Sequence, residues 1–84
     1  MNGIIQTAEE ARIQYLKERN LWSEKNGQYL SEVNKAIQQA NKEGLKNVVI
    51  DIPEVVNVNF FLSLLRDLGY KVDGLMQKII IIGW

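Results

Sequence analysis

The chain has 84 residues, 46% of them hydrophobic and 24% charged, which is ordinary for one globular domain spanning residues 1–84. Ten basic and ten acidic side chains give a formal net charge of zero, which disfavours recognition of nucleic acid through its phosphates. Cysteine and histidine are absent, which excludes disulfides, Cys/His zinc sites, thiol nucleophiles and imidazole acid–base chemistry. A core of this size is marginal alone, so we expect a homo-oligomer.

The sequence shows no targeting or membrane signal. Residues 1–6 lack the basic region and the long apolar run of a secretory signal. The longest apolar run, at residues 79–82, has four isoleucines and is far shorter than a membrane span. We therefore expect a cytoplasmic protein without membrane contact.

A first helix is predicted to start near Thr7. The Thr7 hydroxyl suits an N-cap, and Glu10 occupies the position of its capping-box partner. Ala8, Ala11 and Tyr15 follow at helical spacing and form a narrow apolar stripe. We interpret this stripe as a packing face.

The helical pattern is interrupted between residues 21 and 28. Asn26 and Gly27 are poor helix-interior residues, so we predict two helices with a break between them. The apolar periodicity nevertheless continues across the break, because Tyr15, Trp22 and Tyr29 are spaced by seven residues. A single long helix, interrupted or bent near Asn26-Gly27, is the alternative.

The second helix is predicted from a broad apolar face surrounded by polar residues. Lys42 suits the negative end of the helix dipole, and Gly44 suits a left-handed C-cap. The apolar face consists of Tyr29, Leu30, Val33, Ala36, Ile37 and Ala40.

The second half of the chain predicts strands around a third helix. Residues 47–52 are rich in β-branched side chains and form the first expected strand, which Pro53 ends. The third helix is capped by Asn57 or Asn59 and runs to Leu68.

A hairpin is predicted to follow the third helix. Gly69 ends that helix, and residues 70–73 form a short second strand. Asp73-Gly74 is a turn signal, after which residues 79–82 form the last strand.

The isoleucines at residues 79–82 must point alternately to the two faces of their strand. A strand that is apolar on both faces needs cover on both, so we place it in the middle of the sheet. The predicted fold class is α+β, with N-terminal helices followed by a split βαβ-type three-stranded sheet in which the C-terminal isoleucine strand is central. The third helix is expected on one face, and the second helix, alone or with the first, or a second subunit on the other.

Four segments spread over the chain carry a family resemblance. They are Thr7-Ala8-Glu9-Glu10-Ala11-Arg12, Glu32…Ile37…Ala40…Gly44, Leu65…Leu68-Gly69-Tyr70-Lys71-Val72 and Ile82-Gly83-Trp84. Together they resemble small proteins encoded by bacteriophages and prophages of Gram-positive bacteria, although each segment also has a structural explanation. The resemblance implies an intracellular phage accessory protein, and it implies no activity, cofactor or binding residue.

Three acidic residues are the candidates for chemistry. Asp51, Glu54 and Asp73 are expected near strand ends, where grouped carboxylates bind Mg²⁺ or act as acid and base. No spacing forces them together, and no nucleophile–base pair accompanies them. We therefore predict no catalytic, cofactor-binding or metal-binding residues, no cofactor and no enzyme activity.

Basic side chains on the N-terminal helices suggest the alternative function, a nucleic-acid-binding accessory factor. They would form a strip beside which Tyr15, Trp22 and Tyr29 could stack bases. Acidic residues are interleaved, so a solvated face of mixed charge is the simpler interpretation. The basic residues are Lys17, Arg19, Lys25, Lys35, Lys42 and Lys46, and the acidic ones are Glu18, Glu24, Glu32 and Glu43.

The aromatic residues carry the preferred functional hypothesis, because aromatic side chains are enriched in interface cores. Tyr15, Trp22, Tyr29 and Trp84 either cover their own sheet or lie in part at an interface, and the first three are the expected interface anchors. The N-terminal helices and the two outer strands are the expected contact elements. The sequence thus predicts a non-catalytic protein-interaction module that self-associates and binds a host or phage protein.

Overall fold

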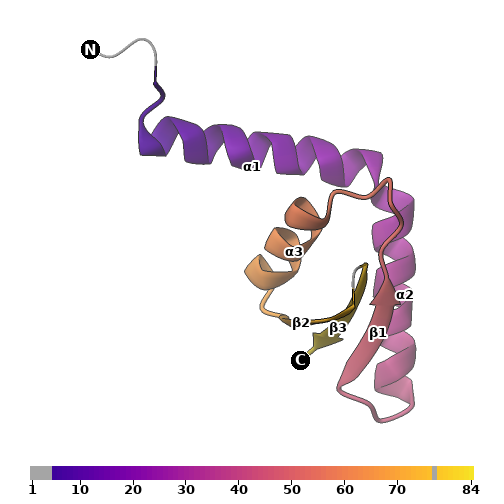
Figure 1. The fold of residues 1–84 in the computed structure, drawn as a ribbon. Coiled ribbons are helices and arrows are strands. Elements are labelled where there is room, and N and C mark those ends of the chain that lie inside the picture. Colours follow the sequence, from indigo (N-terminus) through magenta and orange to yellow (C-terminus); the bar gives the residue numbers. More distant parts are fainter. Residues whose placement is uncertain (1–4, 77) are drawn as a thin grey trace.

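The computed structural model describes residues 5–76 and 78–84. In chain order, this part of the protein contains α1 (Ala8–Lys25), α2 (Gly27–Lys42), β1 (Asn47–Asp51), α3 (Val58–Asp67), β2 (Lys71–Met76) and β3 (Ile79–Gly83). The helices and an antiparallel three-stranded sheet make an α+β fold, as predicted (Figure 1).

The isoleucine strand is central, as predicted. The strand order is β1-β3-β2, and β3 is antiparallel to both neighbours. Ile82 pairs with Val48 on one side and with Val72 on the other, while Ile80 pairs with Ile50. Since residues that pair across strands share a face, these side chains point to the same side of the sheet.

The predicted turn at Asp73-Gly74 is wrong. Both residues lie inside β2, with Asp73 opposite Ile81 and Gly74 opposite Ile80. The strand then continues past a bulge, and the turn before β3 includes Lys78, whose φ is 70°. Asp-Gly favours a turn only where strand pairing stops, and here the pairing with β3 extends the strand.

One face of the sheet carries the core. Ile50, Ile80 and Ile82 are buried there together with Ile37 of α2 and the fully buried ring of Phe61 from α3. In Figure 1, α2 lies along β1, and contacts also join α3 to β2. Both helices therefore belong to the same layer.

The prediction that the second helix covers the other face is wrong. Strands lie about 4.8 Å apart and packed helices about 8–10 Å apart, so two helices are needed to cover one face of three strands. The opposite face has no helix on it within the described part of the chain. Val49 is 56% exposed there, Ile79 and Ile81 are half-buried, and Lys71 and Asp73 are exposed.

The N-terminal region forms two helices, as predicted, which meet at Asn26. At the junction, Asn26 has φ −109° and ψ 22°, and its side-chain amide donates to the Trp22 carbonyl at 2.8 Å. α2 begins at the next residue and runs in a different direction from α1 (Figure 1).

The other helix ends also follow the sequence signals. The Asn57 side chain accepts a hydrogen bond from the Phe60 N–H at 3.1 Å and caps α3. Gly44 and Gly69, after α2 and α3, have φ 80° and 95°, which only glycine adopts without strain.

The molecule is elongated. Its radius of gyration is 15.3 Å and its extents are 56 × 22 × 22 Å, whereas a compact domain of this length has a radius of gyration of about 12 Å. Figure 1 shows the cause, because α1 extends well beyond the layer of helices and strands.

Replacing Phe61 by Ala should lower the free energy of unfolding by about 3–5 kcal/mol, because it empties the centre of the core. Val55, which is 89% exposed, supplies the control, and Val55→Ala should change stability by less than about 0.5 kcal/mol. Urea unfolding followed by circular dichroism measures both. Equal effects of the two substitutions would contradict the packing described above.

Candidate functional site

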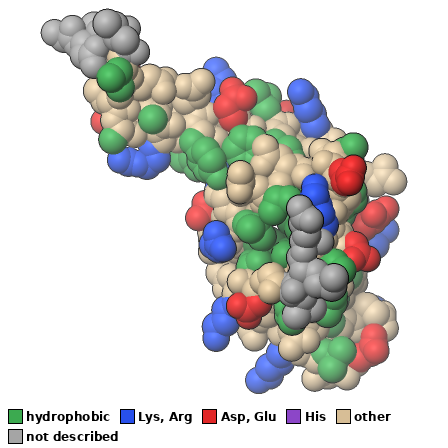
Figure 2. All heavy atoms as spheres, in the orientation of Figure 1, with side chains coloured by type: hydrophobic (Ala, Val, Ile, Leu, Met, Phe, Trp, Pro, Cys, Tyr) green, Lys and Arg blue, Asp and Glu red, His purple; other side chains and the backbone are tan. Residues whose placement is uncertain are grey.

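The candidate site is the N-terminal part of α1. Residues 8–18 are all exposed, and we call them the exposed segment of α1. Within it, 61% of the surface of Ile13 and 41% of that of Leu16 is open to solvent. Figure 2 shows hydrophobic side chains among charged ones along the arm that α1 forms. Two neighbouring apolar side chains on a protruding helix suit contact with a groove of a partner protein.

Contacts from Tyr15 and Arg19 to α3 set the direction in which α1 extends. The Tyr15 and Phe60 rings lie 5.4 Å apart between centroids, where α1 meets α3. Arg19 donates to the Ser63 hydroxyl at 3.0 Å and forms an ion pair with Asp67. The side chain of Arg19 is only 11% exposed, so this contact holds α1 against α3 with little freedom.

The exposed segment has its own helix start. The Glu10 N–H donates to the Thr7 hydroxyl at 3.1 Å, and the Thr7 N–H donates to the Glu10 carboxylate at 2.9 Å, which completes the predicted capping box. The Thr7 backbone N–H, followed by its hydroxyl, holds the pKa of Glu10 below its ordinary value. Local bonds of this kind stabilise a helix that tertiary packing does not support.

Trp22 lies in the core of its own chain. It is 9% exposed, and its ring centroid lies 6.0 Å from Phe60 and 6.3 Å from Phe61. Its buried indole N–H has no acceptor among the described residues. The prediction that Trp22 anchors an interface is wrong, and its ring is not available to stack a base.

Tyr29 also packs within its own chain. Its ring meets Phe61 edge-on at 5.5 Å, and its hydroxyl donates to the Asp51 carbonyl of β1 at 3.0 Å. These contacts leave Tyr29 half-buried, and its expected role at an interface stays a prediction. Of the three predicted anchors, Tyr15 is the most exposed, at 39%. Trp84 joins the last strand to α2, because its indole donates to Asn41 at 2.9 Å.

Sequence reasoning missed the exposed segment. The sequence predicts that the stripe of Ala8, Ala11 and Tyr15 is a packing face, whereas in the structure Ala8 and Ala11 are exposed and Tyr15 packs its ring against Phe60. A signal was present, because Ile13 and Leu16 lie outside that stripe and leave α1 without one apolar face. A helix of this kind is either solvated or packed on more than one side.

The structure does not bring the three acidic candidates together. Asp51 and Asp73 lie on the two outer strands, which β3 separates by about 10 Å. Glu54 lies in the loop after β1, and all three are exposed. Among the described residues, no group of three or more acidic side chains is placed to hold a metal ion.

The predicted basic strip is interrupted. Arg19 turns toward α3 and pairs with Asp67, while Lys17 and Lys25 on the same helix are exposed. Because the rings of Trp22 and Tyr29 pack against Phe61, the strip lacks most of its expected stacking surface.

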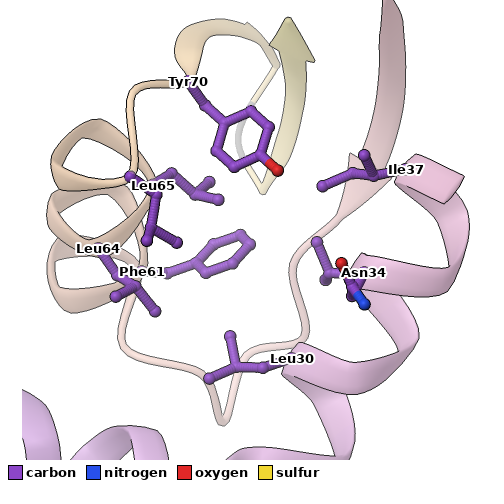
Figure 3. Close-up of a pocket in the computed structure, with 9 residues that line it drawn as sticks. Leu30, Asn34, Ile37, Phe61, Leu64, Leu65 and Tyr70 are labelled. Atoms are coloured by element: carbon purple, nitrogen blue, oxygen red, sulfur yellow. The ribbon is translucent and has the colours of Figure 1, made fainter. Parts of the chain in front are cut away.

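An apolar hollow of about 240 Å³ opens between α2 and α3. Figure 3 shows Leu30 and Ile37 of α2 facing Phe61 and Leu65 of α3 across it, with Tyr70 at one side. Small-molecule sites usually measure about 300–1,000 Å³ and combine apolar walls with several polar groups. This hollow has the size and character to receive a single apolar side chain.

Within the described residues, no helix combines the length and the apolar character needed to cross a membrane. No protein-family model, curated protein or solved structure matches the chain. The resemblance to small phage proteins therefore stays a prediction.

Alkaline pH should destabilise the protein through Tyr29. Burial, followed by the charges of Asp51 and Glu32, raises the pKa of the Tyr29 hydroxyl from 10.0 to about 12. Between these values the unfolded chain loses the proton and the folded chain keeps it, so the free energy of unfolding falls as pH rises from about 10 to 12. Urea midpoints across this range should fall more steeply for the wild type than for Tyr29→Phe. Parallel curves would contradict the assignment.

Proposed function

We propose that this chain is a non-catalytic protein-interaction module that self-associates and binds another protein through the exposed segment of α1. The observation that carries the proposal is a capped helical segment, with apolar side chains in solvent, held in a fixed direction away from its own core. The sequence resemblance adds the proposal that the module is an accessory protein of a phage or prophage.

The arrangement of the segment favours a particular kind of partner surface. Ile13 and Leu16 are three residues apart, so they lie on one side of the helix. Arg12, Lys17 and Glu9 lie near them and are exposed. Two apolar side chains three residues apart on one side of a helix can insert together into an apolar groove. We therefore propose a partner protein with an apolar groove whose rim carries charges of both signs.

Nucleic acid binding has less support. It would depend on base stacking by the aromatic residues of α1 and α2, and both Trp22 and Tyr29 are engaged in the core. The net charge of zero offers no general attraction for phosphate.

The double variant Ile13→Lys with Leu16→Lys should abolish partner binding without unfolding the protein, because both side chains are exposed. Loss of two anchors is expected to weaken binding by about 30-fold or more. The measurement is a pull-down of tagged protein from host lysate, with and without nuclease. The partner should be recovered near one-to-one by the wild type and not by the double variant.

The matched control is Leu45→Lys with Val55→Lys, which places two lysines at exposed apolar positions away from α1. This control should recover the partner as the wild type does. Recovery of the same protein by the Ile13/Leu16 variant would refute the role of α1. Recovery that nuclease abolishes would favour nucleic acid.

A further inference from the structure

The outer edge of β2 has backbone groups available for pairing, and the hydrogen bonds beside β1 show which ones. The Trp84 N–H donates to the Lys46 carbonyl at 3.0 Å, and the Ile52 N–H donates to the Lys78 carbonyl at 2.7 Å. These bonds join even-numbered residues of the two segments. Because bonding alternates along an antiparallel pair, the odd-numbered residues of β3 point their backbone groups toward β2.

The same alternation sets the direction of the groups along β2. Lys71 pairs with Gly83 and Asp73 with Ile81, so their N–H and carbonyl groups point toward β3. The N–H and carbonyl groups of Val72 and Gly74 therefore point out of the sheet. Within the described part of the chain, no hydrogen bond reaches those outward groups.

The other edge of the sheet is better protected. The Asp51 carbonyl of β1 accepts a hydrogen bond from the Tyr29 hydroxyl, and α2 lies beside this strand. α3 likewise lies beside β2, but among the described residues no side chain bonds to the outward backbone groups of this strand, and an unpaired edge is a template for another strand.

We propose that two copies of this chain pair antiparallel through their β2 edges, about a two-fold axis at Val72. This inference rests on the self-association in the proposed function, and it uses a surface distinct from the exposed segment of α1. A two-fold axis requires the edge to be complementary to itself. At this axis, Val72 lies opposite Val72 of the partner subunit and exchanges both backbone hydrogen bonds with it.

The charges on the open face select this register. With Val72 on the axis, Lys71 lies opposite Asp73 of the partner subunit, and Asp73 lies opposite the partner's Lys71. Only even-numbered residues point their backbone groups outward, so an even-numbered residue must lie opposite an even-numbered one. The two nearest symmetric registers therefore move the two-fold axis by one residue along the strand. One of them places Lys71 opposite its own copy, and the other places Asp73 opposite its own copy. Opposite charges across a strand pair stabilise it and like charges destabilise it.

The helix-covered face fits the same register. Tyr70 lies opposite the partner's Gly74, so an aromatic ring meets a residue without a side chain. The Tyr70 N–H is already used, because it donates to the Leu65 carbonyl at 3.0 Å. The Tyr70 carbonyl can accept from the Gly74 N–H of the partner subunit. Leu68, which is 64% exposed, is the C-cap of α3 and precedes the first residue of β2 by three positions.

Two charge reversals test the pairing, both at exposed positions. Lys71→Asp places two acids opposite each other in each pair, and Asp73→Lys places two bases opposite each other. Each variant alone should dimerise about tenfold more weakly than the wild type. An equimolar mixture of the two variants restores both opposite-charge pairs, so it should form a heterodimer of wild-type strength.

Sedimentation equilibrium at about 50 mM salt, where surface charges are little screened, measures the association. Lys35→Asp and Glu54→Lys are matched controls, because they make the same charge changes at exposed positions away from β2. Both controls should dimerise as the wild type does.

Each other outcome overturns the proposal in a recognisable way. A wild-type dimer that neither reversal weakens would place self-association on another surface and leave the proposed function standing. Weakening that the mixture does not reverse would exclude the register at Val72. A wild type that stays monomeric at about 1 mM would remove self-association itself, while binding through α1 would still be judged by its own pull-down.

Discussion

The burial of Ile80 and Ile82 beneath two helices is the interaction on which the rest of this structure depends. α2 approaches from the β1 side and α3 from the β2 side, and they meet around the fully buried ring of Phe61. Since both helices cover one face of the sheet, no described element is left to cover the other face or the β2 edge. α1 reaches this core only through its C-terminal part, so its beginning stands in solvent. The exposed surfaces are thus consequences of one packing arrangement.

Local signals predicted the elements of this fold well, because each depends on a few neighbouring residues. The capping box of Thr7, the cap at Asn57 and the left-handed Gly44 all lie where backbone chemistry requires them. The two wrong predictions about the fold concern contacts between distant segments. The hairpin turn depends on how far β3 pairs with β2, and the placement of α2 depends on the width of the sheet. Neither quantity can be obtained from a short window of sequence.

The interaction surface was harder to predict than the fold, for a related reason. A spacing of seven residues places Tyr15, Trp22 and Tyr29 on one side of the helical pattern. It does not identify what that side packs against. The length of α3 (Val58–Asp67) determines how much of α1 is covered, because α1 is longer than the helix it crosses. Beyond α3 the same helix face enters solvent. The sequence did contain a clue, because the apolar side chains of α1 lie on several sides of the helix. An interpretation that looks for one apolar stripe overlooks them.

The run of identical residues in β3 has a consequence for folding. If β3 slipped by one residue, Ile79 and Ile81 would replace Ile80 and Ile82 against the helices, and the hydrocarbon offered to the core would be unchanged. The strand therefore carries little information about its own alignment. Trp84 supplies the missing information about alignment. In the observed register its ring packs edge-on against Tyr70 and its indole N–H donates to Asn41. A strand slipped by one residue would bring Gly83 to the position of Trp84. The last residue of the sequence thus discriminates between two otherwise similar sheets.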